Sequence, residues 1–273
     1  MNFFEKIVYG LDAQMIKPQM YGWFHLLFMG IMIATTVLLC IFCKNCSKKA
    51  VKWLVFSAWL VMLIFEIFKQ LVFSFNYDPS TGTVVWDYQW YAFPYQLCST
   101  PLYALPFVAF CKDGKFRDSM IAFVSTLAFF GGLVTMIYPA TVFTGSIVVN
   151  LQTMIHHGLQ VALGIFLLVH ERRKLNFKYF LRGVAVFAVA LGIAMAANFI
   201  MRAITTETFN MFYISPYYSC ELPLLDMIQA NTHYVVFLLV YIVGFFGAAI
   251  AMYYIQYGFI KLGMRPKKAR KIN

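Results

Sequence analysis

Long apolar stretches separated by short polar connections follow one another along almost the whole chain. A bilayer core of about 30 Å is crossed by about 20 apolar residues in helical conformation. The pattern contains seven stretches of about this length. We therefore predict an all-α polytopic membrane protein, a single domain over residues 1–273, with helices near residues 21–42, 53–75, 89–111, 119–138, 151–169, 180–201 and 232–255.

The connections between these stretches alternate in charge. Most of the 22 basic residues fall in the segments 44–52, 112–117, 172–182 and 261–271, and the alternate connections hold very few. Because Lys and Arg accumulate in cytoplasmic loops, this distribution predicts that the amino terminus lies outside and the carboxyl terminus in the cytosol. The expected location is the cell membrane.

Composition supports the same class of protein, since 62% of the residues are hydrophobic and only 12% are charged. The first residues include Glu5, Asp12 and Pro18, so we expect no removable signal peptide. The net charge of +11 is spread over four short segments, which indicates a signal for topology and lipid headgroups. We expect no nucleic-acid partner.

Polar side chains inside the apolar stretches gather at one depth. From a rise of about 1.5 Å per residue, Cys98 and Glu66 lie roughly 14 Å below the outer surface and His157 roughly 9 Å below it. The same outer half holds His25, Lys69, Gln70, Gln96, Gln152, His156, Asn198 and Arg202. Ionisable groups are costly in hydrocarbon, so this gathering predicts a polar cavity that opens toward the outer leaflet.

Each of these residues also has a purely structural interpretation. Glu66 with Lys69 or Gln70, at spacings of three and four, is the pattern of a self-satisfied pair on one helix. Cys98 alone is typical of a small buried apolar residue, and a histidine can serve as a hydrogen bond between helices. The grouping at one depth is what favours a functional site.

The stretch PYQLCSTPLYALP, residues 94–106, suggests what the cysteine does. Its three prolines free backbone carbonyls, which a membrane helix tolerates only where protein or water satisfies them, so this segment is predicted to lie inside the bundle. A thiol in apolar surroundings needs a base to become a nucleophile. His156 and His157 are adjacent, about 100° apart on a helix, so one of them is expected to face Cys98. Such a pair supports acyl transfer.

The motifs resemble those of the YwaF-like integral membrane proteins, the family of transmembrane protein 164. The resemblance lies in the P-x-x-L-C of residues 94–98, the HG of residues 157–158 and Asn198 with Phe199, in order, and His25 and Glu66 fit the same pattern. It implies a cysteine-dependent acyltransferase that moves acyl chains between membrane lipids without a cofactor.

Carried over residue by residue, the resemblance gives three roles. Cys98 is the implied nucleophile and His157 its base, with His156 as the alternative, and Asn198 would orient the histidine or the ester carbonyl. The chain departs from bacterial members at Gln96, where they often have histidine. A second imidazole beside the cysteine is therefore missing at that position.

Other patterns favour other functions less well. Cys40, Cys43 and Cys46 are spaced like metal ligands but lack a fourth ligand nearby, so no metal is expected. A retinal protein is excluded because the last stretch, 232–255, holds no lysine. A transporter or receptor with a polar cavity for a small solute stays the alternative. The aromatic connection 202–231 is interpreted as a lid over the cavity or as an amphipathic surface loop.

Overall fold

Six helices in the structure, a computed structural model that describes residues 1–263, are long and apolar enough to cross a membrane. Their bounds are α2 Trp23–Phe42, α3 Lys48–Val72, the continuous run α5–η3–α6 Lys115–Ile137, α7 Ile147–His170, α8 Phe177–Ile204 and α10 Tyr234–Gly263. The run consists of α5 Lys115–Phe123, η3 Val124–Ala128 and α6 Phe129–Ile137. The prediction of an all-α polytopic membrane protein is confirmed.

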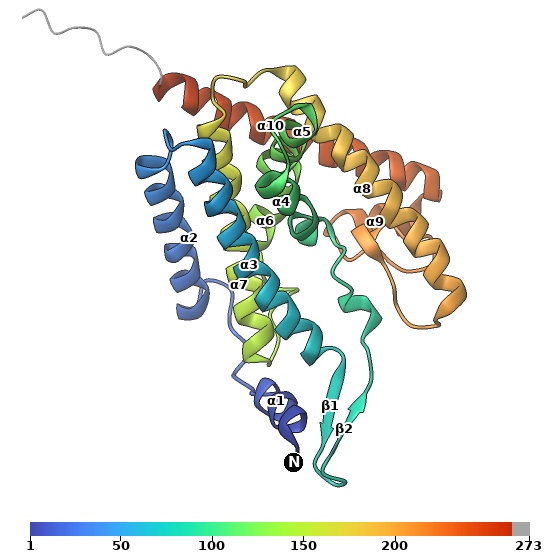
Figure 1. Cartoon of the computed structure of the whole chain (residues 1–273). Coiled ribbons are helices and arrows are strands. Elements are labelled where there is room, and N and C mark those ends of the chain that lie inside the picture. Colours follow the sequence, from blue (N-terminus) through green and yellow to red (C-terminus); the bar gives the residue numbers. More distant parts are fainter. Residues whose placement is uncertain (264–273) are drawn as a thin grey trace, which may run out of the picture.

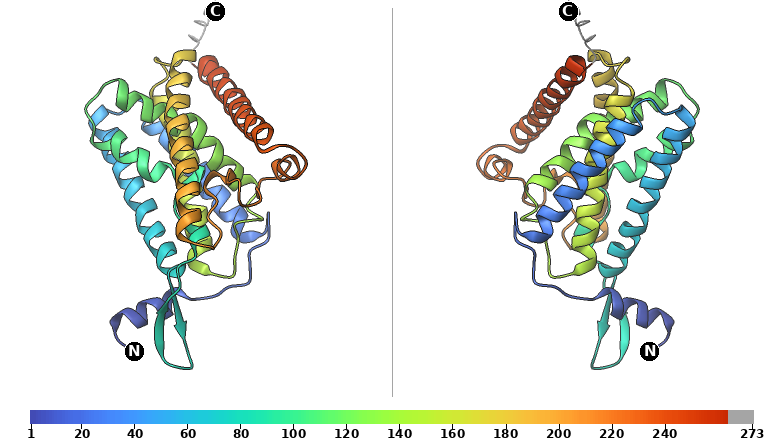
Figure 2. Two further views of the ribbon diagram at one scale, coloured as in Figure 1. Left: turned by 90° about the vertical axis from the view of Figure 1, so that its right-hand side faces the viewer. Right: turned by 90° about the vertical axis from the view of Figure 1, so that its left-hand side faces the viewer.

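Shorter elements connect or flank these helices. They are α1 Phe3–Leu11, β1 Phe75–Asp78, β2 Thr83–Trp86, η1 Trp90–Ala92, η2 Leu97–Ser99, α4 Pro101–Phe110, η4 Met211–Tyr213 and α9 Leu225–Asn231. The two strands form an antiparallel hairpin in which Phe75 pairs with Trp86. Together with α1, this hairpin projects from the end of the bundle opposite the last turns of α10 (Figure 2).

Side-chain caps begin three of the long helices. Ser47, Ser146 and Asn176 each accept a hydrogen bond from the backbone N–H three residues later, at the starts of α3, α7 and α8. Such caps satisfy one of the four backbone N–H groups that a helix start leaves unpaired. The polar residues that interrupt the apolar pattern therefore define these helix starts locally.

Helix α7 is the centre of the bundle. Of its most apolar 18 residues 72% are buried, against 17% for α2 and for α10, and it packs against α2, α3 and α6. This explains why α7 carries the polar residues that lipid-facing helices cannot hold. The two adjacent histidines thus lie on the most enclosed helix, while α2 and α10 present apolar side chains outward.

The third predicted helix, residues 89–111, differs in the structure. It is α-helical only over Pro101–Phe110, with a short 3-10 turn before it and an irregular segment from residue 87 to residue 96. The prolines explain the difference, because they remove backbone donors and disfavour helix in the preceding residue. This segment still runs from one end of α3 to the other, since Gln89 bonds Phe73 and Lys52 reaches the carbonyl of Cys111.

Side chains replace the hydrogen bonds that the prolines remove. Pro106 frees the carbonyl of Leu102, four residues earlier, and the indole Nε1 of Trp59 donates to that oxygen at 2.9 Å. Pro101 frees the carbonyl of Leu97, which accepts from Thr100. The backbone is therefore satisfied inside the protein, as a membrane interior demands.

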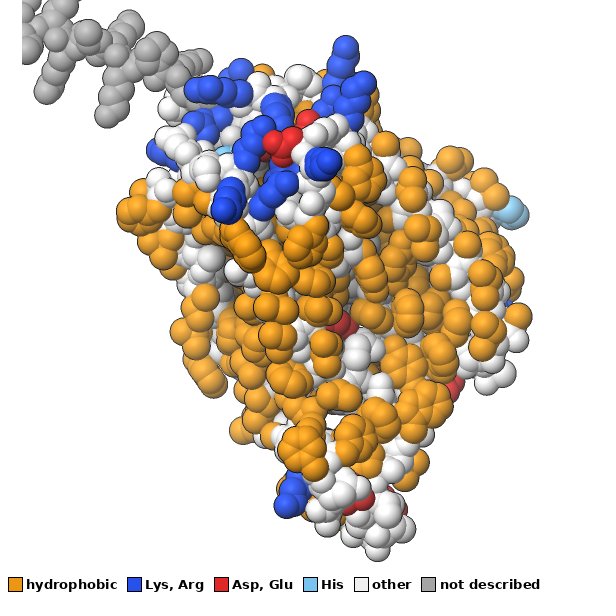
Figure 3. Space-filling view, viewed as in Figure 1, with side chains coloured by type: hydrophobic (Ala, Val, Ile, Leu, Met, Phe, Trp, Pro, Cys, Tyr) orange, Lys and Arg blue, Asp and Glu red, His pale blue; other side chains and the backbone are white. Residues whose placement is uncertain are grey.

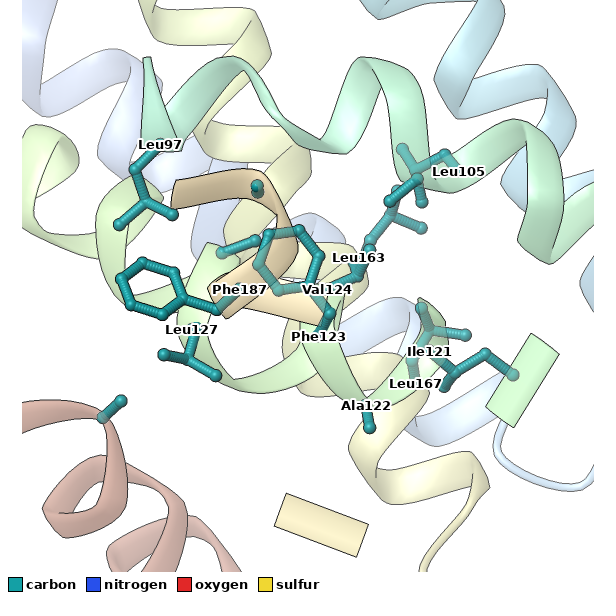
Figure 4. Packing of buried hydrophobic residues seen from close by; sticks show 14 of the residues in the cluster. Leu97, Leu105, Ile121, Ala122, Phe123, Val124, Leu127, Leu163, Leu167 and Phe187 are labelled. Carbon is teal, nitrogen blue, oxygen red and sulfur yellow. The ribbon is translucent and has the colours of Figure 1, made fainter. Parts of the chain in front are cut away.

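The apolar core joins this broken segment to the α5–η3–α6 run and to α7. Figure 4 shows Leu97 and Leu105 packed near Phe123 and Leu127 of the α5–η3–α6 run and near Leu163 of α7. All five are buried. One face of α4 is buried in this core, whereas Tyr103, Phe107 and Phe110 on its other side are exposed, so the predicted interior helix is only partly interior.

A π-helical turn, Val124–Ala128, lies in the middle of the α5–η3–α6 run. The wider turn disturbs the regular hydrogen bonding, and Gln160 of α7 donates its amide hydrogen to the carbonyl of Ala128. A Cβ added at Gly183 of α8 would lie 2.8 Å from the hydroxyl oxygen of Thr126. The helices approach closely here because glycine leaves room.

Basic side chains gather at one end of the molecule, above a broad apolar band (Figure 3). There Lys48 forms an ion pair with Asp113 at 2.7 Å, and this hydrogen bond holds the pKa of the Asp113 carboxyl below its ordinary value. Several further basic residues of the predicted cytosolic tail lie outside the described residues: Arg265, Lys267, Lys268, Arg270 and Lys271. The charge pattern read from the sequence thus corresponds to one face of the fold.

Candidate functional site

Cys98 lies where the irregular segment turns into helix, within the 3-10 turn Leu97–Ser99. Its side chain is partly buried and forms no disulfide. Tyr103 donates its hydroxyl hydrogen to the carbonyl of Pro94 at 2.9 Å, which fixes the chain just before the cysteine. On the other side, α6 approaches so closely that a Cβ at Gly131 would lie 3.6 Å from the backbone nitrogen of Cys98.

His156 contacts the backbone of this cysteine directly. Its Nε2 lies 2.9 Å from the carbonyl oxygen of Cys98. A carbonyl can only accept, so this nitrogen must carry the proton, and a neutral ring then has its lone pair on Nδ1. Nδ1 is buried and has no hydrogen-bond partner within residues 1–263. The bond therefore fixes one tautomer of His156 and leaves one basic nitrogen unused.

His157 has the opposite tautomer. Its Nδ1 lies 2.6 Å from the carbonyl oxygen of Thr153, one turn earlier in α7, so Nδ1 carries the proton and Nε2 holds the lone pair. Nε2 is also buried without a partner in the described part of the chain. The two rings lie 5.3 Å apart between centroids. Two adjacent imidazoles thus present two unused basic nitrogens.

Buried polar atoms without a partner are rare in folded proteins, so this pair needs an explanation. Each histidine is also almost fully buried, at 1% and 6% exposed. The thiol of Cys98 forms no hydrogen bond to either ring among the residues that the structure describes. The structure therefore brings His156 to the backbone of Cys98, and it leaves both imidazoles free to accept a proton.

Glu66 is the centre of a second buried group on α3 and α7. Its two carboxylate oxygens accept from Lys69 at 2.8 Å, from Gln70 at 2.7 Å and from Gln152 at 2.8 Å. Gln70 also donates to the carbonyl of Ala92, in the irregular segment. The Glu66 side chain is 4% exposed and that of Lys69 14%. This network joins two helices to the segment that carries Cys98.

Gln96 and Asn198 both bond the loop between α8 and α10. Gln96 donates to the carbonyl of Asn210 and accepts from the N–H of Phe212 at 2.7 Å. Asn198 pairs in the same way with both backbone groups of Met211. The structure thus places Asn198 on this loop, where the resemblance implied a contact with the histidine or the ester carbonyl.

The loop itself packs into the core. Phe209, Met211, Phe212 and Ile214 are at most 2% exposed, and Phe212 and Tyr213 have positive φ angles of 59° and 57°. For residues other than glycine, such a conformation costs about 1–3 kcal/mol each and persists only where the surroundings impose it. Part of the predicted lid, residues 209–214, is therefore a buried plug held beside Gln96.

Two predicted cavity residues lie elsewhere. His25 uses both ring nitrogens, since Nδ1 accepts from the N–H of Tyr21 and Nε2 donates to the carbonyl of Met136 at 2.8 Å. This matches the structural interpretation of a histidine that joins two helices. Arg202 is exposed, and its guanidinium lies 5.5 Å from the ring centre of Tyr217.

The sequence reasoning missed Thr153, Tyr88 and Gln160. Thr153 gives the carbonyl that fixes His157, and its position four residues earlier in a helix could have indicated this. Tyr88 donates to the side-chain oxygen of Gln70. Gln160 is a buried amide inside an apolar stretch, and that polarity was a usable signal.

The cysteine run gives no cluster of metal ligands. Within residues 1–263, no group of three or more His, Cys, Asp or Glu side chains lies close enough to hold a metal ion. Cys40, Cys43 and Cys46 are free, partly buried thiols. Cys220, in the connection between α8 and α10, is a free buried thiol, so it is a poor target for labelling from solution.

An apolar pocket of about 180 Å³ lies where α2 and α3 meet α7, lined by Phe28, Ile31, Met32, Thr35, Val61, Met154, Ile155, Gly158 and Leu159. This pocket is not the polar cavity that the sequence predicted. Among the residues expected to line that cavity, Glu66, Gln70 and Gln152 bond one another and the backbone. At about 100° per residue, the pocket-lining residues of α7 face away from His156 and His157.

These features define a polytopic α-helical membrane protein in which a buried histidine of α7 bonds the backbone of the partly buried Cys98. Comparison of the chain with known families gives the same class, because the TMEM164 family matches residues 20–257. The chain belongs to this family, as the motifs had indicated. No curated protein and no solved structure matches the chain.

Proposed function

We propose that the protein transfers acyl chains between membrane lipids through a thioester on Cys98, with His157 as the general base. The observation that carries the proposal is the pair of adjacent buried imidazoles beside Cys98: His156 bonds the Cys98 carbonyl and His157 the Thr153 carbonyl, and each ring keeps one nitrogen without a partner in the described part of the chain. A nucleophile with a base beside it is the minimum for covalent acyl transfer.

The two histidines have different roles in this proposal. His156 donates through Nε2, the outer nitrogen of its ring, to the Cys98 carbonyl and so positions the nucleophile. His157 bonds a carbonyl of its own helix through Nδ1 and keeps its outer nitrogen, Nε2, without a partner in the described part of the chain. We therefore assign proton transfer to His157 and positioning to His156.

The chemistry balances without a cofactor. His157 takes the thiol proton while the sulfur attacks the ester carbonyl of a donor lipid, and the tetrahedral intermediate collapses to a thioester. The departing lyso-lipid oxygen takes the proton back from the imidazole. A hydroxyl of the acceptor lipid then attacks the thioester by the reverse path, which regenerates the thiol. Donor and acceptor are thus both membrane lipids.

The membrane arrangement that goes with this proposal has seven crossings. The segment from residue 87 to residue 110 runs from the Val72 end of α3 to its Lys48 end and adds to the six long helices. With the basic end in the cytosol, the amino terminus is outside, the carboxyl terminus is cytosolic, and the cysteine lies toward the outer leaflet of the cell membrane.

The covalent intermediate provides the test of the function. Purified protein in vesicles of phosphatidylcholine with a radiolabelled acyl chain should acquire label that hydroxylamine releases, because hydroxylamine cleaves thioesters. Peptide mapping should place the label on Cys98, and Cys98→Ser should lack the hydroxylamine-sensitive label. Cys40→Ser is the matched control and should retain it, since Cys40 lies at the far end of α2.

A protein that never becomes acylated under these conditions, with a panel of phospholipid donors, would contradict the enzyme. Saturable binding of a water-soluble solute without turnover would then favour the alternative, a transporter or receptor. Label on Cys40 or Cys43 that survives Cys98→Ser would show simple surface acylation of cytosolic thiols.

Orientation has its own test. Pro79→Cys at the hairpin tip and Lys178→Cys at the start of α8 both replace exposed residues. We expect a membrane-impermeant maleimide added to intact cells to label Pro79→Cys above the parent background and to label Lys178→Cys only after lysis. The opposite pattern would reverse the orientation. Cys220 is unsuitable because it is 3% exposed.

A further inference from the structure

The pocket between α2, α3 and α7 is not explained by the proposed catalysis. It is lined by Met32 and Ile31 of α2, Val61 of α3, and Ile155 and Gly158 of α7. These residues belong to the middle turns of their helices, so the pocket lies within the apolar band of the molecule. Figure 1 shows the three helices next to one another on one side of the bundle.

Neither water nor vacuum is a favourable occupant of this volume. Its lining is almost entirely carbon, and apolar cavities of this kind stay dry. An empty space of about 180 Å³ leaves its wall atoms without the contacts that close packing supplies, each worth about 0.1–0.2 kcal/mol. The occupant must therefore be hydrocarbon.

The pocket is open to the surrounding lipid. Ile31 is 50% exposed and Val61 40% exposed, although both line it. In a membrane such exposure means contact with acyl chains. An acyl chain of a neighbouring lipid can enter the pocket without separation of the helices. Lipid acyl chains are also the most concentrated hydrocarbon in the apolar part of a membrane.

Gly158 makes the pocket deep. A Cβ at this position would lie 3.7 Å from the Cβ of Met32, which is an ordinary van der Waals contact. An alanine would therefore fit here without a shift of the backbone. Any larger side chain extends from α7 into the pocket. Gly158 therefore keeps open a space that its helix would otherwise fill.

We propose that this pocket binds one acyl chain of a membrane phospholipid, as a site separate from Cys98 and its histidines. The chain lies in the wedge between α2 and α3 and rests on the Gly158 face of α7. The histidines lie on the opposite face of the same helix. The site does not depend on the proposed function, and it persists in a protein that transfers nothing.

Photolabelling tests the proposal directly. The probe is phosphatidylcholine with a diazirine midway along one acyl chain, diluted in vesicles of plain phosphatidylcholine that hold the full-length protein. We expect label concentrated in the peptides that contain Met32 and Ile155, above the label on the exposed faces of α8 and α10. Cys98→Ser should give the same pattern, which separates this result from the fate of the catalytic proposal.

Variants that fill the pocket supply the control. Gly158→Phe should lose most of the label at Met32, and Val61→Trp should do so from the other wall. Gly30→Phe is matched, because Gly30 is in the same part of α2 and has nothing within 4 Å of its Cβ position; it should keep the parent label. Only variants that purify as monodisperse protein are compared. If Gly158→Phe does not fold, Val61→Trp still tests the site.

Two results would overturn the proposal. One is label spread evenly over all lipid-facing helices, which describes ordinary surrounding lipid. The other is label that neither filling variant reduces, or that Gly30→Phe reduces equally. A diazirine fatty acid serves as the second arm, and enrichment with the free acid but not with the phospholipid also contradicts the assignment.

Discussion

Replacing His157 with alanine should slow acylation of Cys98 by about 10²–10⁴-fold, the usual contribution of a general base. The reason is the free Nε2 of His157, which alone on that ring can take the thiol proton once Nδ1 is committed to Thr153. The measurement is the single-turnover rate of hydroxylamine-sensitive labelling in phosphatidylcholine vesicles. Added imidazole should restore part of the rate.

His156 gives the matched comparison. His156→Gln keeps an amide N–H that can donate to the Cys98 carbonyl, so it should retain more of the rate than His156→Ala, and imidazole should rescue neither variant. This pattern distinguishes a positioning residue from a base. Imidazole rescue of His156→Ala, with an unaffected His157→Ala, would exchange the two roles.

Glu66→Gln should be the most destabilising single change in the polar network, by about 3–5 kcal/mol in unfolding free energy. It removes the partner of Lys69, whose ammonium is 2.8 Å from the carboxylate and largely buried, and it leaves a charge in a low-dielectric interior. Gln70 and Gln152 lose their charged acceptor as well. Reversible unfolding in detergent micelles measures the effect.

Two variants test that this cost comes from the unpaired charge. Adding Lys69→Met to Glu66→Gln should recover a large part of the loss, because no buried charge remains. Lys48→Met breaks an ion pair of similar length, 2.7 Å, but Lys48 is 69% exposed, so it should cost less than about 1 kcal/mol. Equal losses in Glu66→Gln and Lys48→Met would contradict the argument.

The six long helices could be predicted closely from the sequence. Predicted spans such as 21–42 and 151–169 correspond to α2 at Trp23–Phe42 and α7 at Ile147–His170. The signal is strong because hydrocarbon admits little besides paired backbone and apolar side chains over this length. The ends were less accurate, and α10 continues to Gly263, beyond the predicted end at 255.

The third span shows where the pattern is insufficient. Residues 89–111 are apolar enough to look like one helix, yet the α-helix begins only at Pro101, after two short 3-10 turns. Hydrophobicity along the chain indicates burial, but it gives little information on whether backbone carbonyls accept hydrogen bonds from other elements. The prolines indicated an irregular interior segment, but the donors Trp59 and Gln70 could not be named without coordinates.

The candidate site was partly predictable for a similar reason. The grouping of Cys98, His156 and Glu66 was expected from their positions along the chain, and the structure buries His156 and Glu66 and bonds His156 to the carbonyl of the partly buried Cys98. Which atom bonds which depends on rotation of each helix, and the sequence does not fix that. Gln96 and Asn198 thus turned out to hold the loop at residues 209–214, whose burial the aromatic composition only suggested.

The irregular segment before Cys98 has a consequence for how the chain is made. Its carbonyls at Ala92 and Cys98 take their hydrogens from Gln70, already synthesised, and from His156, which the ribosome adds 58 residues later. Until then the carbonyl oxygen of Cys98 needs water or another donor. Helices α2 and α3 can form in order of translation, whereas the cysteine-bearing stretch acquires its last backbone partner only when α7 has been made.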